Sequence, residues 1–164
     1  MALRRQSPSS ELSRARNIVL STIPSDSHTW NLLFLQLFLE EHGCVVTNLG
    51  ACVPLETLVA ESVQSRPDLI VISTVNGHGL HEGLELARAV RATAELRGVP
   101  LVIGGKIDTS GSHTAADFRP LLDAGFDAVL VGETAVPDLL SWLDRIPVEE
   151  SVGSLETAYA DATF

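Results

Sequence analysis

The chain has 164 residues and a formal net charge of −10 at pH 7, and hydrophobic residues make up 45% of it. This length is that of one domain with a single core, and no apolar run approaches the roughly 20 residues that a membrane span needs. Because so acidic a surface would repel phosphate backbones and anionic lipid headgroups, nucleic acid and membranes are disfavoured as partners.

The chain has two cysteines, Cys44 and Cys52, which are eight positions apart. This number and spacing fit neither a zinc site nor a disulfide framework. They fit ordinary thiols in a reducing, cytoplasmic protein. The arginines near the start are not followed by an apolar stretch, so that segment does not look like a secretory signal. We expect a flexible tail over residues 1–16, one domain over residues 17–146 and a loose acidic tail over residues 147–164.

Short β-type runs alternate with helix-like segments along the domain. The runs are residues 17–23, 44–49, 69–75, 100–103 and 128–131. All but the second are nearly continuous aliphatics, which is typical of strands buried on both faces of a parallel sheet, whereas the more polar second run fits an edge strand. The helical segments are predicted at about residues 31–42, 54–65, 80–97, 114–124 and 134–144.

This alternation predicts an α/β fold with right-handed crossovers between its strands. With five strands, the expected architecture is a flavodoxin-like (Rossmann-like) doubly wound parallel sheet with the strand order 2-1-3-4-5. In such sheets, ligands bind beyond the carboxyl ends of the strands, near the switch between the first and third strands. The loops at that edge are therefore the candidates for a site.

The loop after the first strand places Asp26 two residues before His28. A carboxylate that takes the N–H of one imidazole nitrogen fixes the tautomer and leaves the other nitrogen free to bind a metal. The alternative is that Asp26 caps the following helix while His28 is merely exposed. On spacing alone, the second interpretation is favoured.

The loop after the third strand carries His78, His81 and Glu82. These residues could form a metal cluster or an acid/base pair, but a polar loop that opens a helix explains them as well. No GxGxxG follows the first strand and no GxxxxGK[ST] occurs, so neither a dinucleotide site nor a P-loop is supported. A phospho-accepting response regulator shares this fold, but it needs a carboxylate at the end of the third strand, which this chain lacks.

Three motifs at the carboxyl edge, taken together, resemble the B12-binding domains of mutases and corrinoid methyltransferases, and most of all the small, cobalamin-binding subunit of glutamate mutase (methylaspartate mutase). That family's D-x-H-x-x-G loop, S-x-L strand end and G-G turn correspond to Asp26-Ser27-His28, Ser73-Thr74-Val75 and Gly104-Gly105. The likeness covers roughly residues 17–144. Two positions depart from the pattern: Asn31 replaces the loop glycine, and Val75 replaces the leucine.

The resemblance implies a cofactor bound with its dimethylbenzimidazole displaced from cobalt and replaced by His28, whose other nitrogen Asp26 would hold. The displaced nucleotide tail would enter a slot between the sheet and its helices, where Ser73 would hydrogen-bond the base and Val75 would pack on it. The cofactor-binding residues so implied are Ser25, Asp26, Ser27, His28, Thr29, Ser73, Thr74, Val75, Gly104, Gly105, Ile107, Gly132 and Thr134.

The resemblance also implies a role as the cofactor subunit of an adenosylcobalamin-dependent carbon-skeleton mutase, above all glutamate mutase. The chain would ligate the cofactor and supply no other catalytic residue, and a separate large catalytic subunit, in an expected heterotetramer, would bind the substrate. The alternatives are a corrinoid carrier for methyl transfer, with methylcobalamin as cofactor, and a non-catalytic or degenerate cobalamin-binding module.

Overall fold

The computed structural model describes residues 14–109, 114 and 116–147. Within them, five parallel strands form one sheet in the order β2-β1-β3-β4-β5, which confirms the predicted fold and the edge position of the second strand. The strands are β1 (Asn17–Ser21), β2 (Val45–Asn48), β3 (Leu69–Thr74), β4 (Leu101–Gly105) and β5 (Ala128–Leu130). The predicted tails fall mostly outside the described residues.

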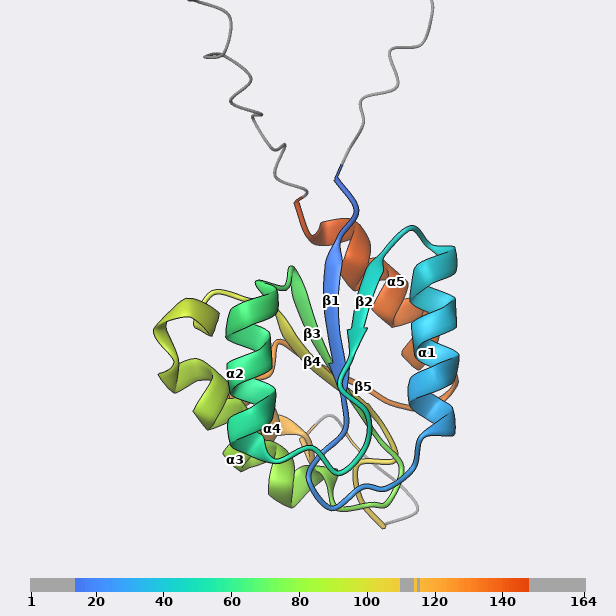
Figure 1. Ribbon diagram of the computed structural model, residues 1–164. Coiled ribbons are helices and arrows are strands. Elements are labelled where there is room, and N and C mark those ends of the chain that lie inside the picture. Colours follow the sequence, from blue (N-terminus) through green and yellow to red (C-terminus); the bar gives the residue numbers. More distant parts are fainter. Residues whose placement is uncertain (1–13, 110–113, 115, 148–164) are drawn as a thin grey trace, which may run out of the picture.

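Helices cover both faces of the sheet (Figure 1). One layer contains α1 (Trp30–Glu41) and α5 (Ala135–Arg145), and the other contains α2 (Leu55–Ser65), α3 (Gly79–Ala92) and α4 (Arg119–Ala124). The loops that follow the strands gather at the lower end of the molecule in Figure 1. The start of β1 and the end of α5 meet at the opposite end, where the Arg16 side chain donates to the carbonyl oxygen of Ile146.

Two predicted helices are shorter than expected. The third ends at Ala92 because Thr93 has an extended backbone, and a short 3-10 helix (Ala94–Leu96) follows it. Within the described residues, the fourth helix begins only at Arg119. Pro120 lies in its first turn, where a residue without an N–H is tolerated, whereas the same residue would break a helix interior.

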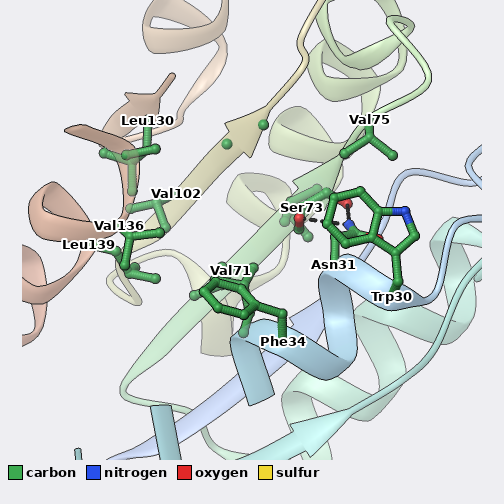
Figure 2. Close-up of a pocket in the computed structure, with 15 residues that line it drawn as sticks. Trp30, Asn31, Phe34, Val71, Ser73, Val75, Val102, Leu130, Val136 and Leu139 are labelled. Carbon is green, nitrogen blue, oxygen red and sulfur yellow. Dashed lines mark hydrogen bonds between the residues drawn. The ribbon is translucent and has the colours of Figure 1, made fainter. Parts of the chain in front are cut away.

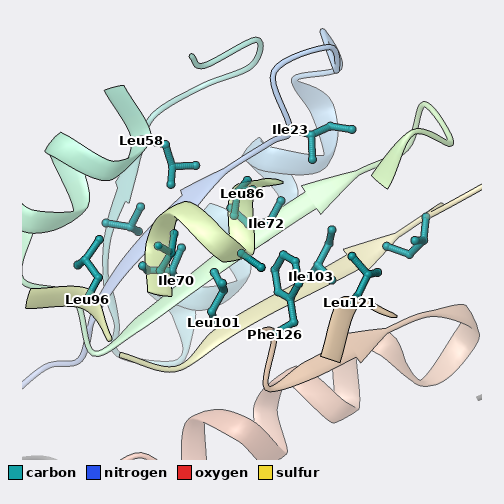
Figure 3. Packing of buried hydrophobic residues seen from close by; sticks show 14 of the residues in the cluster. Ile23, Leu58, Ile70, Ile72, Leu86, Leu96, Leu101, Ile103, Leu121 and Phe126 are labelled. Carbon is teal, nitrogen blue, oxygen red and sulfur yellow. The ribbon is translucent and has the colours of Figure 1, made fainter. Parts of the chain in front are cut away.

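Side chains alternate between the two helix layers along each strand. In β3, Ile70 and Ile72 join the core under α2, α3 and α4, which Figure 3 shows around Leu86 of α3. Val71 faces the layer of α1 and α5. All six residues of β3 are buried, as a strand covered on both faces requires. The same alternation directs Ser73 toward α1 and α5.

No helix among the described residues is both long enough and apolar enough to cross a membrane.

A glycine is required at the end of β4 by the sheet itself. Gly105 has a φ of 102°, and a Cβ there would collide with the carbonyl oxygen of Thr74 on β3. We expect Gly105→Ala to lower the free energy of unfolding by about 3 kcal/mol, measured by urea denaturation. Gly98→Ala is the control, since a Cβ there meets nothing within 4 Å. Equal stability of the two variants would contradict this account.

Candidate cofactor-binding site

A buried carboxylate organises the loop after β1. The side chain of Asp26 is 0% exposed, and the structure gives it five hydrogen-bond donors. Its Oδ1 accepts the backbone N–H of His28 at 3.1 Å and faces His28 Nδ1 at 2.7 Å. Its Oδ2 accepts from Thr74 Oγ1 at 2.8 Å and from the backbone N–H groups of Val75 and Asn76 at 2.7 and 3.3 Å.

These donors decide the charge of the carboxyl group. Burial alone would raise the pKa of Asp26, but hydrogen bonds from the N–H groups of Val75 and His28, from the His28 ring and from the Thr74 hydroxyl lower the pKa to about 2. At neutral pH the group is therefore a carboxylate without a proton. The short contact to His28 consequently requires the proton on Nδ1 of the imidazole.

The imidazole of His28 thus presents an unprotonated Nε2 in its neutral form, and its side chain is 47% exposed. A carboxylate on one nitrogen and an open lone pair on the other is the arrangement that orients metal-binding histidines. Helix α1 begins at Trp30 with Thr29 as its N-cap residue, so Asp26 does not cap it. The structure therefore agrees with the interpretation in which Asp26 pairs with the imidazole of His28, and not with the one in which Asp26 caps the helix.

An apolar pocket of about 220 Å³ lies at the carboxyl edge of the sheet, between the ends of the central strands and the helices α1 and α5. Figure 2 shows its walls, with Leu139 and Val136 of α5 at one end and Trp30, Ser73 and Val75 at the other. Its lining residues are Trp30, Asn31, Phe34, Leu35, Val71, Ile72, Ser73, Val75, Val102, Gly104, Gly105, Leu130, Ala135, Val136 and Leu139.

The sequence creates this pocket by alternation. Val71 and Ser73 of β3, and Val102 and Gly104 of β4, follow one another at intervals of two and share the face toward α1 and α5. Gly104 adds no side chain, which leaves space above the strand. Because an apolar cavity of about 150 Å³ already holds a benzene ring, this pocket has room for a larger aromatic ring such as the base of a cobalamin tail.

The polar groups of the pocket are concentrated where α1 meets β3. Asn31 Nδ2 donates to Ser73 Oγ at 2.8 Å and approaches the Ser73 carbonyl oxygen at 3.4 Å (Figure 2). Asn31 replaces the motif glycine but lies in the first turn of α1, outside the left-handed region. The substitution therefore changes the space and the hydrogen bonding at this position, and not the backbone conformation.

The candidate residues differ in where the structure places them. Ser73, Val75, Gly104 and Gly105 line the pocket, and Thr74 holds Asp26. Four further candidates are exposed on the loop after β1, namely Ser25, Ser27, His28 and Thr29. The pocket lining does not include Ile107, Gly132 or Thr134.

Ile107 lies beyond the end of β4, where its carbonyl oxygen accepts the backbone N–H of Leu80 at the start of α3. Leu101 and Ile103 of β4 belong to the core under α3, and the side chain of Ile107 is buried in that core as well. Gly132 and Thr134 are exposed in a short 3-10 helix before α5. For these three, as for the other candidate residues, the cofactor-binding role stays a prediction.

Sequence reasoning did not select the walls that α1 and α5 contribute. The lining residues from these helices include Trp30, Phe34, Leu35, Val136 and Leu139. A signal was present in α1, whose segment WNLLFLQLFLEE has more apolar residues than one buried face requires.

The histidines after β3 do not form a metal site. Among the described residues, no group of three His, Cys, Asp or Glu side chains is placed to hold a metal ion. His78 is the N-cap residue of α3, and Glu82 accepts the backbone N–H of Ser25 at 3.0 Å. The plainer interpretation, a polar loop that opens a helix, fits these contacts.

Asp26 should make the cofactor-free protein sensitive to acid. Its folded pKa of about 2 lies below the ordinary value of 3.8, so the stabilisation is fully present above about pH 5 and is lost as the pH falls through 3.8 toward 2. This difference corresponds to about 2 kcal/mol. We expect Asp26→Asn to be less stable at pH 7 and to lose this part of the pH dependence in urea titrations from pH 7 to pH 2.

The matched control is Asp123→Asn, because the Asp123 side chain is 62% exposed and pairs with Arg119 on the surface of α4. It should keep the pH profile of the unmodified protein. An Asp26→Asn profile parallel to that of the unmodified protein would contradict the assignment.

Comparison with known proteins places these features in a family. Residues 16–140 match the family model described as the B12 binding domain. The glutamate mutase sigma subunit of Treponema denticola is 30% identical over 132 residues, which are 78% of this chain and 94% of that protein. The transcriptional repressor CarH of Myxococcus xanthus is 34% identical over 104 residues, but these are only 34% of that protein.

Solved structures show the same fold. A cobalamin-binding protein from Desulfitobacterium hafniense superimposes with a TM-score of 0.64 at 21% identity, covering 80% of this chain and 59% of that one. The response regulator CheY4 of Vibrio cholerae superimposes with a TM-score of 0.60 at 19% identity, covering 81% of this chain and 100% of that one. With the family match over residues 16–140 and its motif residues gathered at one edge of the sheet, the chain belongs to the B12-binding domain family.

Proposed function

We propose that this chain is the cobalamin-binding subunit of an adenosylcobalamin-dependent carbon-skeleton mutase, above all glutamate mutase, which converts L-glutamate to 3-methylaspartate. The observation that carries the proposal is the imidazole of His28, held by a buried carboxylate beside an apolar pocket. The alignment across 94% of a glutamate mutase sigma subunit supports the mutase over other members of the family.

Each residue would have a separate task toward the cofactor. His28 would ligate cobalt through Nε2, and Asp26 would keep the proton on Nδ1 and the ring in place. The Ser73 hydroxyl would donate to the displaced base, while Val75 and Gly104 would enclose its ring. Bound adenosylcobalamin would supply a carbon radical by homolysis of its cobalt–carbon bond, as the cofactor carries the hard chemistry.

A large catalytic subunit would supply the substrate site. The pocket lining contains no carboxylate, imidazole or ammonium group that could work on an amino acid. The outer face of α1 is also unusually apolar, because Trp30, Leu33, Phe34 and Leu37 are each more than half exposed. This face adjoins the pocket, which contains Trp30 and Phe34, so a partner that covers the cofactor could cover this surface too.

The second candidate is a cobalamin-binding module without catalysis, which the 34% identity to the repressor CarH favours. A corrinoid carrier is supported by fold alone, through the monomethylamine corrinoid protein of Methanosarcina barkeri, with a TM-score of 0.62 at 16% identity. Turnover with a large mutase subunit distinguishes the mutase from both.

His28→Ala tests the axial ligand. We expect the unmodified protein, labelled with ¹⁵N-histidine, to give reduced cob(II)alamin an EPR spectrum split by one ¹⁵N nucleus. The variant should lose that splitting and bind adenosylcobalamin at least about tenfold more weakly. Removing a residue that merely supports a metal ligand already lowers metal affinity by about that factor, and here the ligand itself is removed.

His78→Ala is the matched control, because His78 is exposed at the same edge of the sheet. Its backbone N–H, and not its ring, donates to Asn76 Oδ1. It should keep both the ¹⁵N splitting and the affinity. If the labelled protein instead shows splitting by ¹⁴N, the coordinating nitrogen does not belong to histidine. The cofactor's own base would then stay on cobalt, and the ligand assignment would be wrong.

The chain alone should not turn over substrate. We expect no 3-methylaspartate from L-glutamate and adenosylcobalamin with this chain alone, and formation of product once a large mutase subunit is added. The assay is chromatographic detection of 3-methylaspartate over several hours. Product formed by the isolated chain would contradict the proposed division between subunits.

A further inference from the structure

The pocket contains a buried hydrogen-bond acceptor without a partner. Asn31 is 5% exposed, and its Oδ1 is one of two buried side-chain atoms among the described residues that have no hydrogen bond, the other being Ser62 Oγ. Asn31 lines the pocket, whereas Ser62 lies on α2 in the opposite helix layer. An unpaired buried acceptor is unfavourable, and natural proteins keep few of them.

The orientation of the amide follows from its neighbours. The other end of the Asn31 amide faces both the hydroxyl and the carbonyl oxygen of Ser73. Because a carbonyl oxygen only accepts, the nitrogen must point toward Ser73 and the oxygen must be the unpaired atom. A flipped amide would place two oxygens against each other.

The same contact orients the hydroxyl of Ser73. Its oxygen accepts from Asn31, and its hydrogen has no acceptor among the described residues. The pocket therefore offers a donor, the Ser73 hydroxyl, next to an acceptor, Asn31 Oδ1. The remaining lining residues near them, such as Val71 and Val75, are apolar.

We propose that Asn31 selects the lower base of the bound cobamide and favours a base with an N–H donor, such as a 6-aminopurine, over dimethylbenzimidazole. This inference rests on the proposed function, in which the displaced tail enters the pocket. Both bases have a ring nitrogen that can accept from Ser73. Dimethylbenzimidazole carries methyl groups and, once joined to its ribose, no N–H, so it would leave Asn31 Oδ1 unpaired, whereas an exocyclic amino group would pair with it.

The experiment is calorimetric titration of the full chain with two cobamides that differ only in the lower base, adenosylcobalamin and its 6-aminopurine analogue. We expect the unmodified protein to bind the aminopurine form about tenfold more tightly, as one hydrogen bond to an otherwise unpaired buried acceptor predicts. Asn31→Ala and Asn31→Gly remove the acceptor and should abolish this ratio. The absorbance spectrum of each complex reports independently whether the base has left cobalt.

Val136→Ala is the matched control, because Val136 lines the same pocket without a polar side-chain atom. It should weaken both cobamides by a similar factor and keep their ratio. Equal affinities in the unmodified protein, or a ratio that survives in both Asn31 variants, would overturn the inference and leave the proposed function standing. Binding of neither cobamide would overturn both.

Discussion

The buried carboxylate of Asp26 is the interaction on which the rest of the site depends. It joins the loop after β1 to the end of β3 through Thr74, Val75 and Asn76, and it holds the ring of His28 as well. A buried charge is tolerated only when donors replace the water it has lost, and here the polypeptide supplies all of them. Loop position, charge and histidine tautomer are therefore parts of one network.

A second constraint comes from the close packing of the strands beside the pocket. A Cβ on Gly104 would lie 2.8 Å from the carbonyl oxygen of Leu130, and one on Gly105 would collide with that of Thr74. The glycine pair is therefore required by the sheet before any ligand is considered. Its absent side chains also keep the floor of the pocket open, so the same pair serves the fold and the cavity.

Local patterns in the sequence were enough to predict the strand order and to identify the loops that lie together at the carboxyl edge of the sheet. Continuous aliphatic runs identify strands covered on both faces, and β3 is buried throughout. Patterns of this kind do not show which helix side chains enclose a cavity, because Phe34 and Leu139 look like ordinary core residues. The position of Ile107 could not be predicted from strand alternation, because β4 ends at Gly105 and the positive φ of that glycine interrupts the pattern.

The exposure of the two paired residues differs for a physical reason. Asp26 is fully buried, whereas the His28 side chain is 47% exposed. The buried carboxylate therefore holds the imidazole in one orientation, while the half of the side chain that is exposed leaves Nε2 accessible. An imidazole held in one orientation loses little further freedom when it binds, which favours ligation without any new contact. In the proposed function, affinity for the rest of the cofactor would come from the apolar pocket. In the proposed function, the loop would orient the ligand atom, and the space between α1 and α5 would bury the ring of the base.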